Sequence, residues 1–486
     1  MSMRLPAHSL RALLVAGAVV LVAACTEVGP NYVRPSVHVP AAYKEASQPE
    51  APRAHAAPTA GMWWEIYRDP TLDALVAQVE VSNQSLAAAA ARVREAQSLV
   101  QAAGGPMEPA VTAGTIKSGR KNQNDFGVGV SWELDLWGRI RRDVEAHRAT
   151  AEASADDLAA ATLSMQAQVV QSYFALREDD AVIGLLQRAV EADGQLDRMV
   201  RNQYAQGVVS SADVAEALLR FGTVQVQLAD TRSARAQLEH ALAVMLGKPP
   251  ADFSIAPAPF DADVPVIPTG LPASLLERRP DIAARERQMA AASARIGVSK
   301  AETLPSINLA AGIGILKGPT ATADIRWPLF AGGRLQAQVA NAGAAYAEAV
   351  ANYRQTVLDA FREVEDSLVA ADTLAGTAGL LTTAASAAQE SERVTRNQYR
   401  EGVADYPAVV DAVTSALNAG QNGLQLRLRR LDASVNLIKA LGGGWQADAE
   451  RGMKTDAAQG RSRSQPNVPY AAGSASGKSS PSAAQE

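Results

Sequence analysis

The chain carries one cysteine, Cys25, in surroundings typical of a lipidation site. Basic residues precede an apolar run, 12–24, which is too short to span a bilayer and fits the core of a signal peptide. Small residues stand directly before Cys25, as in a bacterial lipobox, where the cysteine becomes the lipidated first residue of the mature chain. Thr26 follows rather than Asp, as expected of lipoproteins sent on to the outer membrane. We therefore predict a signal peptide at 1–24 and lipidation of Cys25. The alternative is a plain signal peptide with a chance cysteine.

The other reactive side chains form no pattern typical of an enzyme. The histidines beyond the signal peptide are scattered, and none stands at metal-ligand spacing from a Cys, Asp or Glu. The sequence has no phosphate-binding loop, and its net charge of −5 provides no basic surface for nucleic acid. After Cys25 no uninterrupted apolar run reaches about 18 residues, which predicts no transmembrane helix. We thus expect no catalytic residues, no cofactor, no bound metal and no nucleic-acid partner, so any energy must come from another protein.

The chain contains a long internal repeat. Residues 201–208 read Arg-Asn-Gln-Tyr-Ala-Gln-Gly-Val, and residues 396–403 read Arg-Asn-Gln-Tyr-Arg-Glu-Gly-Val. The same offset holds over a long run, up to Gly247, which falls on Gly442. A repeat of this length indicates a duplicated structural unit rather than the short repeats of a solenoid. The predicted segments are an extended N-terminal arm at 25–68, a first repeat at 69–247, a Pro-rich linker at 248–272, a second repeat at 273–442 and a disordered C-terminal tail at 443–486.

Each repeat contains one unusually long helix. The first is expected at about 139–206, where no proline occurs and the apolar residues keep a helical period, and it would be about 100 Å long. Gly207 ends it as a C′ residue. Ser210 and Asp213 then start the next helix as a capping box. In the second repeat the corresponding glycine is Gly402.

Shorter helices accompany each long one. Pro70 is expected to open a helix that runs to about Ala103. Its length and that of the helix at about 210–246 add up to one long helix, so the two are predicted to lie end to end beside it. The second repeat permits the same arrangement, with helices at about 281–302 and 407–441.

Two segments alternate with a period of two, which indicates β-hairpins. The first hairpin is expected at about 110–137 with a turn at 117–125, and the second at about 306–330 with a turn at 317–320. One side of the alternation is apolar, and the other is small or acidic. A half-buried sheet in a soluble domain is one interpretation. The other is a transmembrane sheet, which the strand lengths and the aromatic residues near strand ends favour.

The number of strands implies an oligomer if the sheet spans a membrane. Four strands cannot close a barrel, and open sheet edges are not tolerated in lipid. A cyclic trimer would supply twelve strands, an even number within the range of known barrels. We therefore predict a homotrimer.

Three motifs are specific matches to a known family. They are Trp-Glu-Leu-Asp-Leu-Trp-Gly-Arg-Ile at 132–140, Leu-Leu-Glu-Arg-Arg-Pro-Asp-Ile at 275–282, and Trp-Pro-Leu-Phe at 327–330 with Gly-Gly-Arg at 332–334. Through them and the arm at 28–35, the chain resembles the outer-membrane factor family of tripartite efflux pumps (TolC-like). It is most similar to the lipoprotein branch, the NodT-type efflux outer-membrane lipoproteins. The resemblance covers nearly all of residues 21–442.

The resemblance implies a fold that is mainly α with a small transmembrane β part. A trimeric 12-stranded β-barrel would be continued by a long periplasmic α-helical barrel, with two tandem repeats per chain. The protein would be lipid-anchored in the outer membrane, in contact with its lipid, with most of the chain in the periplasm. Its partners would be a periplasmic adaptor and an inner-membrane efflux pump of the RND type. The implied function is a passive exit duct for small toxic compounds or drugs. A duct for type I protein secretion and a non-channel coiled-coil envelope scaffold are the alternatives.

The resemblance also implies roles for residues near the helix–helix turns. The adaptor-docking turns would contain Gly207, Val208, Ser210, Gly402, Val403 and Asp405. The periplasmic aperture would be lined by Glu216, Asp411, Tyr204 and Tyr399. Packing between helices is the alternative for the two tyrosines, and a solvated helix face is the alternative for the two acids.

Two positions depart from the family pattern. Pro407 stands where Leu is frequent, and Thr414 stands where Arg is frequent. Both positions help to build the closed aperture in the family, so its form in this chain is left open. Both hairpin loops are also shorter than usual, which predicts a thin extracellular cap.

Overall fold

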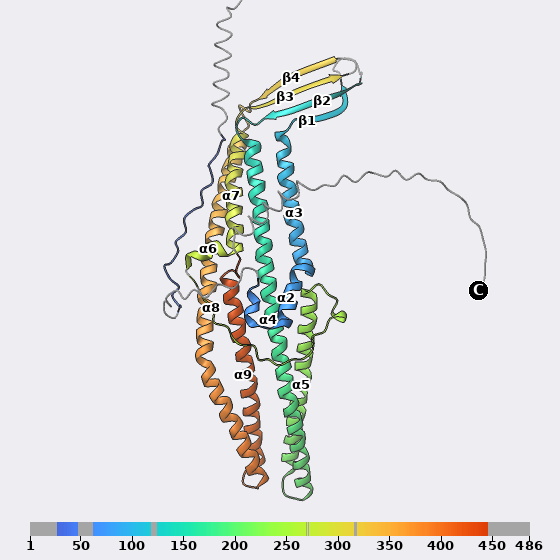
Figure 1. Ribbon diagram of the computed structural model, residues 1–486, viewed down its shortest axis with the longest axis vertical. Helices are drawn as coiled ribbons and strands as arrows, with labels where there is room; N and C mark the ends of the chain where they lie inside the picture. Colours follow the sequence, from blue (N-terminus) through green and yellow to red (C-terminus); the bar gives the residue numbers. More distant parts are fainter. Residues whose placement is uncertain are drawn as a thin grey trace, which may run out of the picture. The chain divides into compact units, whose positions relative to one another are not determined.

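The computed structural model describes residues 27–46, 62–117, 124–268, 270, 272–314 and 318–445. The predicted signal peptide, the lipidation site Cys25, and nearly all of the predicted tail lie outside the described residues. So do the tips of both hairpin loops, on which the predicted thin cap depends. The described part consists of long helices and one four-stranded sheet (Figure 1).

The two repeats contribute matching pairs of long helices. Helices α4 (Arg139–Ala205) and α8 (Arg334–Arg400) each have 67 residues. Helices α5 (Ser211–Met245) and α9 (Tyr406–Ala440) each have 35 residues. Each pair is joined by a tight turn, and both turns lie at the end of the helices that is remote from the sheet (Figure 1). The predicted long helix in each repeat is confirmed.

The predicted helix from Pro70 to about Ala103 is wrong in one respect, because it is two helices. Helix α2 (Pro70–Ser82) and helix α3 (Gln84–Gly104) are separated by Asn83, which has an extended backbone. The Asn83 side chain accepts a hydrogen bond from the Leu86 N–H at 3.0 Å. The same side chain donates to the Met245 carbonyl at 2.7 Å. One asparagine therefore caps the start of α3 and the end of α5, so α3 alone continues the line of α5.

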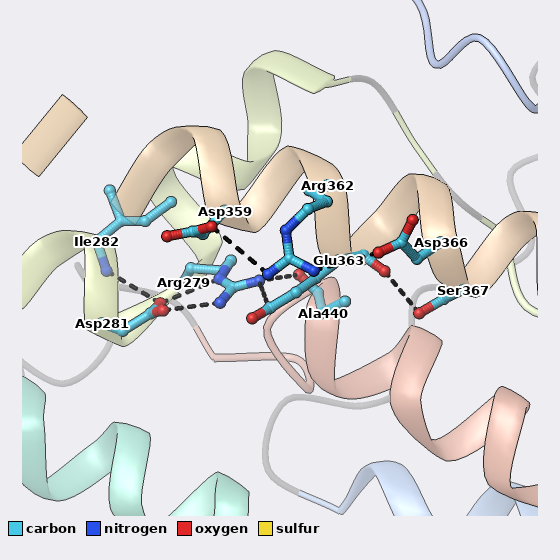
Figure 2. A network of polar contacts seen from close by, with 9 residues as sticks. All are labelled: Arg279, Asp281, Ile282, Asp359, Arg362, Glu363, Asp366, Ser367 and Ala440. Carbon is cyan, nitrogen blue, oxygen red and sulfur yellow. Dashed lines mark hydrogen bonds and ion pairs between the residues drawn. The ribbon is translucent and has the colours of Figure 1, made fainter. Parts of the chain in front are cut away.

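In the second repeat an arginine makes the corresponding joint. Arg279 precedes α7 (Pro280–Ala301) and donates to the Ala440 carbonyl at the end of α9, at 3.2 Å. It also forms ion pairs with Asp281 and with Glu363 of α8, each at 2.7 Å. Figure 2 shows this network, in which one guanidinium reaches three helices. The joint holds α7, α8 and α9 together where α7 and α9 meet end to end.

The sheet is formed by both repeats together. Its strands are β1 (Ala110–Lys117), β2 (Asn124–Leu134), β3 (Ser306–Gly314) and β4 (Gly318–Arg326). They lie in the order β1-β2-β3-β4, and all neighbours are antiparallel. The two hairpins are confirmed, but both turns are narrower than predicted. Lys117, Asn124 and the segment 318–320 belong to strands, because the ladder continues to the pairs Lys117 with Asn124 and Gly314 with Gly318.

The register separates the sheet into two faces of different chemistry. Directly paired residues share a face, so each row can be followed across the strands. The apolar face contains Val111, Ala113, Val128, Val130, Trp132, Leu309, Ala311, Ile313, Ala321, Ala323 and Ile325. The small/polar face contains Ala110, Thr112, Gly114, Gly127, Gly129, Ser131, Glu133, Ser306, Asn308, Ala310, Gly312, Gly314, Gly318, Thr320, Thr322, Asp324 and Arg326. The predicted alternation is confirmed on β2, β3 and β4, whereas on β1 it ends at Gly114, because Ile116 takes a position on the small/polar face.

The largest core lies near the middle of the helices. The 3₁₀ turn η1 (Trp63–Tyr67) buries its aromatic side chains there against α2, α4, α5 and α9. The remaining short elements are η2 (Gly105–Met107), η3 (Pro250–Asp252), η4 (Pro272–Ser274) and α6 (Leu275–Arg278).

The linker between the repeats is attached to three helices through backbone carbonyls. Arg235 of α5 donates to the Ile255 carbonyl at 2.6 Å, and Arg177 of α4 donates to the Ala256 carbonyl at 2.7 Å. Arg427 of α9 donates to the Phe260 carbonyl at 2.5 Å. Hydrogen bonds from charged donors are stronger than those between neutral groups. The linker therefore binds helices of both repeats to one another.

Helix α8 is unusual in its exposure. It is long and apolar enough, by length and composition, to cross a membrane, yet 6% of its apolar window is buried. The prediction of no transmembrane helix rested on uninterrupted apolar runs, and the apolar window of α8 contains polar residues. Leu358, Val369 and Leu380 are exposed on it. A helix with this much uncovered apolar surface fits a contact with another protein chain.

Candidate functional site

The two helix–helix turns have the same backbone geometry. Gly207 and Gly402 both have φ of +73°, in the left-handed region that favours glycine. At the first turn the Val208 N–H donates to the Gln203 carbonyl at 2.9 Å, and at the second the Val403 N–H donates to the Gln398 carbonyl at 2.8 Å. Each glycine N–H also donates to the carbonyl three residues earlier. This pair of bonds defines a Schellman motif. The prediction that both glycines end helices as C′ residues is confirmed.

The helices that follow the turns begin with side-chain caps. Ser210 and Asp213 form a reciprocal capping box at the start of α5. Asp405 accepts from the Ala408 N–H at 3.1 Å at the start of α9. Between glycine and cap, Val208 and Val403 have 67% and 74% of their surface exposed. Each turn therefore presents an apolar side chain on a rigid backbone.

The two tyrosines above the turns differ. Tyr204 is 51% exposed, whereas Tyr399 is 7% exposed. The Tyr399 hydroxyl donates to the Gln203 side chain at 2.7 Å, and its ring lies 6.0 Å from that of Tyr406 in an edge-on arrangement. Burial raises the pKa of Tyr399, with a further contribution from the charge of Asp213. The packing alternative therefore describes Tyr399, and Tyr204 is free to contact another molecule.

The two acids predicted for the aperture are not brought together within one chain. Glu216 is half-buried on α5, and Asp411 is exposed on α9. Within the described part of the chain, neither forms an ion pair. The negative charge of Glu216 contributes to a raised pKa of Tyr406, after burial as the largest cause.

A buried ion pair lies near the tips, and no sequence pattern had indicated it. Arg220 of α5 lies 3.1 Å from Asp193 of α4, and their side chains are 9% and 2% exposed. Arg220 also donates to the hydroxyl of Thr414 and to the Val410 carbonyl, both on α9. Burial raises the pKa of Asp193, and the adjacent guanidinium opposes the shift.

Arg220 links the first helical pair to the second. The available signal was Thr414, which stands where the family frequently has arginine. Sequence alone could not show that an arginine from another helix reaches this hydroxyl, because the two positions are 194 residues apart. The pair exists in the first repeat only, since the positions that match Asp193 and Arg220 are Ala388 and Ser415.

Comparison with known proteins gives a consistent result for both repeats. A family model described as "Outer membrane efflux protein" matches residues 75–248 and 271–443, one match for each predicted repeat. The gap between the matches corresponds to the linker.

Individual relatives and one solved structure extend this result. The pyoverdine export outer membrane protein OpmQ of Pseudomonas aeruginosa is 31% identical over 80% of this chain and 88% of its own length. The probable outer membrane lipoprotein SilC of Salmonella typhimurium is 27% identical over 89% of this chain and 98% of its own. The solved outer-membrane channel OprN superposes with a TM-score of 0.79 at 28% identity, over 86% of this chain and 99% of that structure.

Proposed function

Because the chain belongs to the outer membrane efflux protein family, we propose that three copies form a passive exit duct in the outer membrane. The protein is the outer-membrane channel component of an efflux system. In the proposed trimer the three sheets close into one barrel of twelve strands, and the helices continue the duct into the periplasm.

The two-faced sheet is the observation that carries this proposal. Its apolar face consists of Val, Leu, Ile, Ala and Trp side chains, many of which are exposed in the single chain. Lipid can cover such a face, while the small/polar face suits a wet lumen. Within the described residues, one side of each edge strand, β1 and β4, is unpaired. Open edges are not stable in lipid, so pairing of β4 with β1 of the next copy satisfies both constraints.

The helices supply the length that a periplasmic conduit needs. At 67 residues each, α4 and α8 are about 100 Å long. The exposed apolar residues of α8 provide the surface that a neighbouring copy would cover. The proposed partners at the far end are a periplasmic adaptor and an inner-membrane pump of the RND type.

The two turns are the proposed docking surface for the adaptor. Gly207, Val208, Ser210, Gly402, Val403 and Asp405 form them. Each turn is held by a Schellman motif and an N-cap, so its exposed valine keeps a defined position. A trimer would present six such turns in two alternating types. Charged substitutions at Val208 and Val403 should weaken binding of the adaptor without changing the trimer.

The same end of the molecule is the proposed site of closure. Asp411 and Glu216 would line the aperture together with Tyr204, while Tyr399 supports the wall through Gln203. Replacement of Asp411 and Glu216 by Ala should raise single-channel conductance. Unchanged conductance would contradict their place at the aperture.

The N-terminal arm supports lipidation at Cys25. The Val28 N–H donates to the Trp137 carbonyl at 3.0 Å, and Glu27 pairs with Arg141 at 3.5 Å. Both contacts lie where the sheet joins the helices. In the proposed trimer this junction is at the periplasmic surface of the outer membrane. Two residues reach at most about 7 Å, so an acyl chain on Cys25 would start close to lipid. Cys25→Ser should abolish labelling with radioactive palmitate, and retained label would refute this site.

Small toxic compounds or drugs are the proposed cargo. The family description names efflux, and the relative OpmQ is named for export of pyoverdine. Neither name refers to secretion of a protein. Deletion of the chain should therefore lower resistance to toxic compounds in cells that keep the pump and adaptor, and secreted proteins should be unchanged.

The central test is formation of a pore. Purified full-length protein should run as a heat-modifiable trimer on a denaturing gel and should conduct ions in planar bilayers. A monomer without conductance would support a coiled-coil scaffold instead.

A further inference from the structure

The small/polar face of the sheet carries charged residues in the rows that adjoin the helices. This inference rests on the proposed barrel, in which that face lines the lumen. Toward the loops, the row Gly114, Gly127, Gly314 and Gly318 crosses all four strands, and beyond it the register places Ile116 opposite Asp125. From the glycine row toward the helices, the next rows contain only Gly, Thr, Ala and Ser. The last two rows, which adjoin the helices, contain Glu133, Asn308, Asp324, Ser306 and Arg326. We call these two rows the base rows.

Side-chain size matters more in a barrel of twelve strands than in a larger one. Eight strands leave an interior that side chains fill, whereas sixteen to eighteen leave an open aqueous channel. A twelve-stranded barrel lies between these cases, so the residues on its inner face decide its width. The base rows, with a glutamate, an aspartate and an arginine, therefore leave less room than the rows of Gly, Thr, Ala and Ser beside them.

Each acid in the base rows has its own arginine. Glu133 is bound by Arg139 of α4, with a shortest distance of 2.9 Å, and the two side chains are 27% and 33% exposed. Asp324 lies 3.6 Å from Arg326, and these side chains are 62% and 80% exposed. The first pair is anchored by three hydrogen bonds. The second pair projects further into solvent, so its charges act most directly on a passing solute.

We propose that Asp324 and Arg326 determine the charge preference of the barrel, and that their balance lets cationic and anionic compounds pass with equal ease. An exposed ion pair adds little stability, so stability alone does not account for the opposite charges of Asp324 and Arg326 on this face. The charges of the base rows sum to zero when Arg139 is included, and the register places the next charged residue of this face, Asp125, at the opposite end of the strands. A transport role for the pair is to cancel the potential that either residue would impose.

The potential can be measured with a reporter cysteine in the lumen. Asn308 pairs with Asp324 in the ladder and is exposed. Asn308→Cys in the full-length trimer would be treated, in intact cells, with small thiol reagents that differ only in the sign of their charge. The protein's one native cysteine is Cys25, and the chain without the reporter gives the background. The ratio of the two rates reports the local potential and does not depend on the periplasmic aperture.

Opposite changes are expected from the two partners. In the Asn308→Cys background, Asp324→Asn should shift the ratio toward the anionic reagent by roughly two- to threefold, the size expected for a unit charge about 8 Å away in water. Arg326→Gln should shift it toward the cationic reagent by a similar factor. The double variant should return the ratio to its starting value. High salt should reduce every shift.

Val128→Cys is the matched control, because Val128 lies on the apolar face. Its reaction with either polar reagent should be roughly tenfold slower or more, since entry into lipid is costly for a polar molecule. Trimers in which neither substitution moves the ratio, or in which both move it the same way, would overturn charge balance and leave the proposed function intact. Loss of the trimer in the unmodified protein, or equal labelling of Val128→Cys, would overturn the barrel and the inference together.

Discussion

The two helical pairs of the chain have the same lengths and the same turns but different surroundings. Helix α4 buries side chains along its whole length, from Ile140 to Val200, and packs against α3, α5, α7 and α9. Helix α8 has no buried residue between Ser367 and Tyr399. Duplication thus preserved the backbone of the unit, while its two copies came to occupy different places. The contrast belongs to the long helices, because in the shorter pair the second-repeat helix α9 buries more residues than α5.

The two helical pairs also differ near the helix–helix turns. The first pair contributes a buried charge pair, Asp193 with Arg220, and the second pair contributes the hydroxyl and carbonyl that Arg220 binds. The first repeat has an exposed tyrosine above its turn, and the second has a buried one. A ring of six turns built from this chain would therefore alternate in chemistry while remaining uniform in geometry.

The largest expected effect comes from breaking the asymmetric ion pair. Arg220→Ala would leave Asp193 buried without its partner, a change that typically costs about 3–5 kcal/mol. Thermal unfolding in detergent should show a large drop in midpoint. Ser415→Ala, at the matching position of the second repeat, should leave the midpoint nearly unchanged. Similar small shifts for both variants would show that the pair is not a structural link.

The two turn glycines should be equally sensitive to substitution. Gly207→Ala and Gly402→Ala would each force a side chain into the left-handed region, at a cost of about 1–2 kcal/mol. Space is not the cause, because neither added Cβ meets an atom within 4 Å. Equal shifts in the unfolding midpoint are expected. A clearly larger shift at one turn would mean that its backbone is constrained by a contact beyond the turn itself.

The tyrosines allow a smaller test. Tyr399→Phe removes the hydrogen bond to Gln203 and should cost about 1 kcal/mol. Tyr204→Phe, at the exposed counterpart, should not change stability measurably. If Tyr204→Phe alters conductance or adaptor binding while stability is unchanged, the exposed tyrosine has a role at the aperture.

A pH dependence of stability is also expected, to which Glu178 of α4 contributes. Burial raises the pKa of Glu178 to about 7, with a further contribution from Asp179. A carboxyl group whose pKa is higher in the folded state favours folding below its unfolded value, and that contribution is lost as pH rises through the folded value. Stability should therefore decline between about pH 4.5 and 7. Glu178→Gln should flatten the decline, and Asp372→Asn on exposed α8 should leave it in place. An unchanged slope in Glu178→Gln would assign the effect to other groups.

Regular features were predictable from local pattern. The uninterrupted helices of 67 residues follow from a proline-free run with a helical period, and their ends follow from Gly207 and Gly402. The two faces of the sheet follow from strict alternation. The capping box at Ser210 follows from Ser and Asp at the required spacing. In each case the residues that determine the structure are neighbours in the chain.

Other features depend on residues that are distant in the chain. The break at Asn83 interrupts a good helical pattern because the asparagine also binds the Met245 carbonyl, 162 residues away. The narrower turns follow from ladder pairs that continue beyond the predicted strand ends. Helix α8 has the composition of a membrane helix. The proposed reason is that its apolar side chains are covered by a neighbouring chain of the trimer and not by other helices of the same chain. None of these contacts leaves a local signature.

By itself, the sequence determined the duplication, the long helices, the turn glycines and the two-faced strands, because each depends on backbone preferences or on periodicity that adjacent residues set. The tertiary structure decided which arginine meets Asp193, which tyrosine is buried, and that Asp324 and Arg326 share the base of the sheet with the Glu133–Arg139 pair. These are pairings of charged and polar groups across separate elements. A charge has many possible partners in a sequence, and only the folded chain selects one.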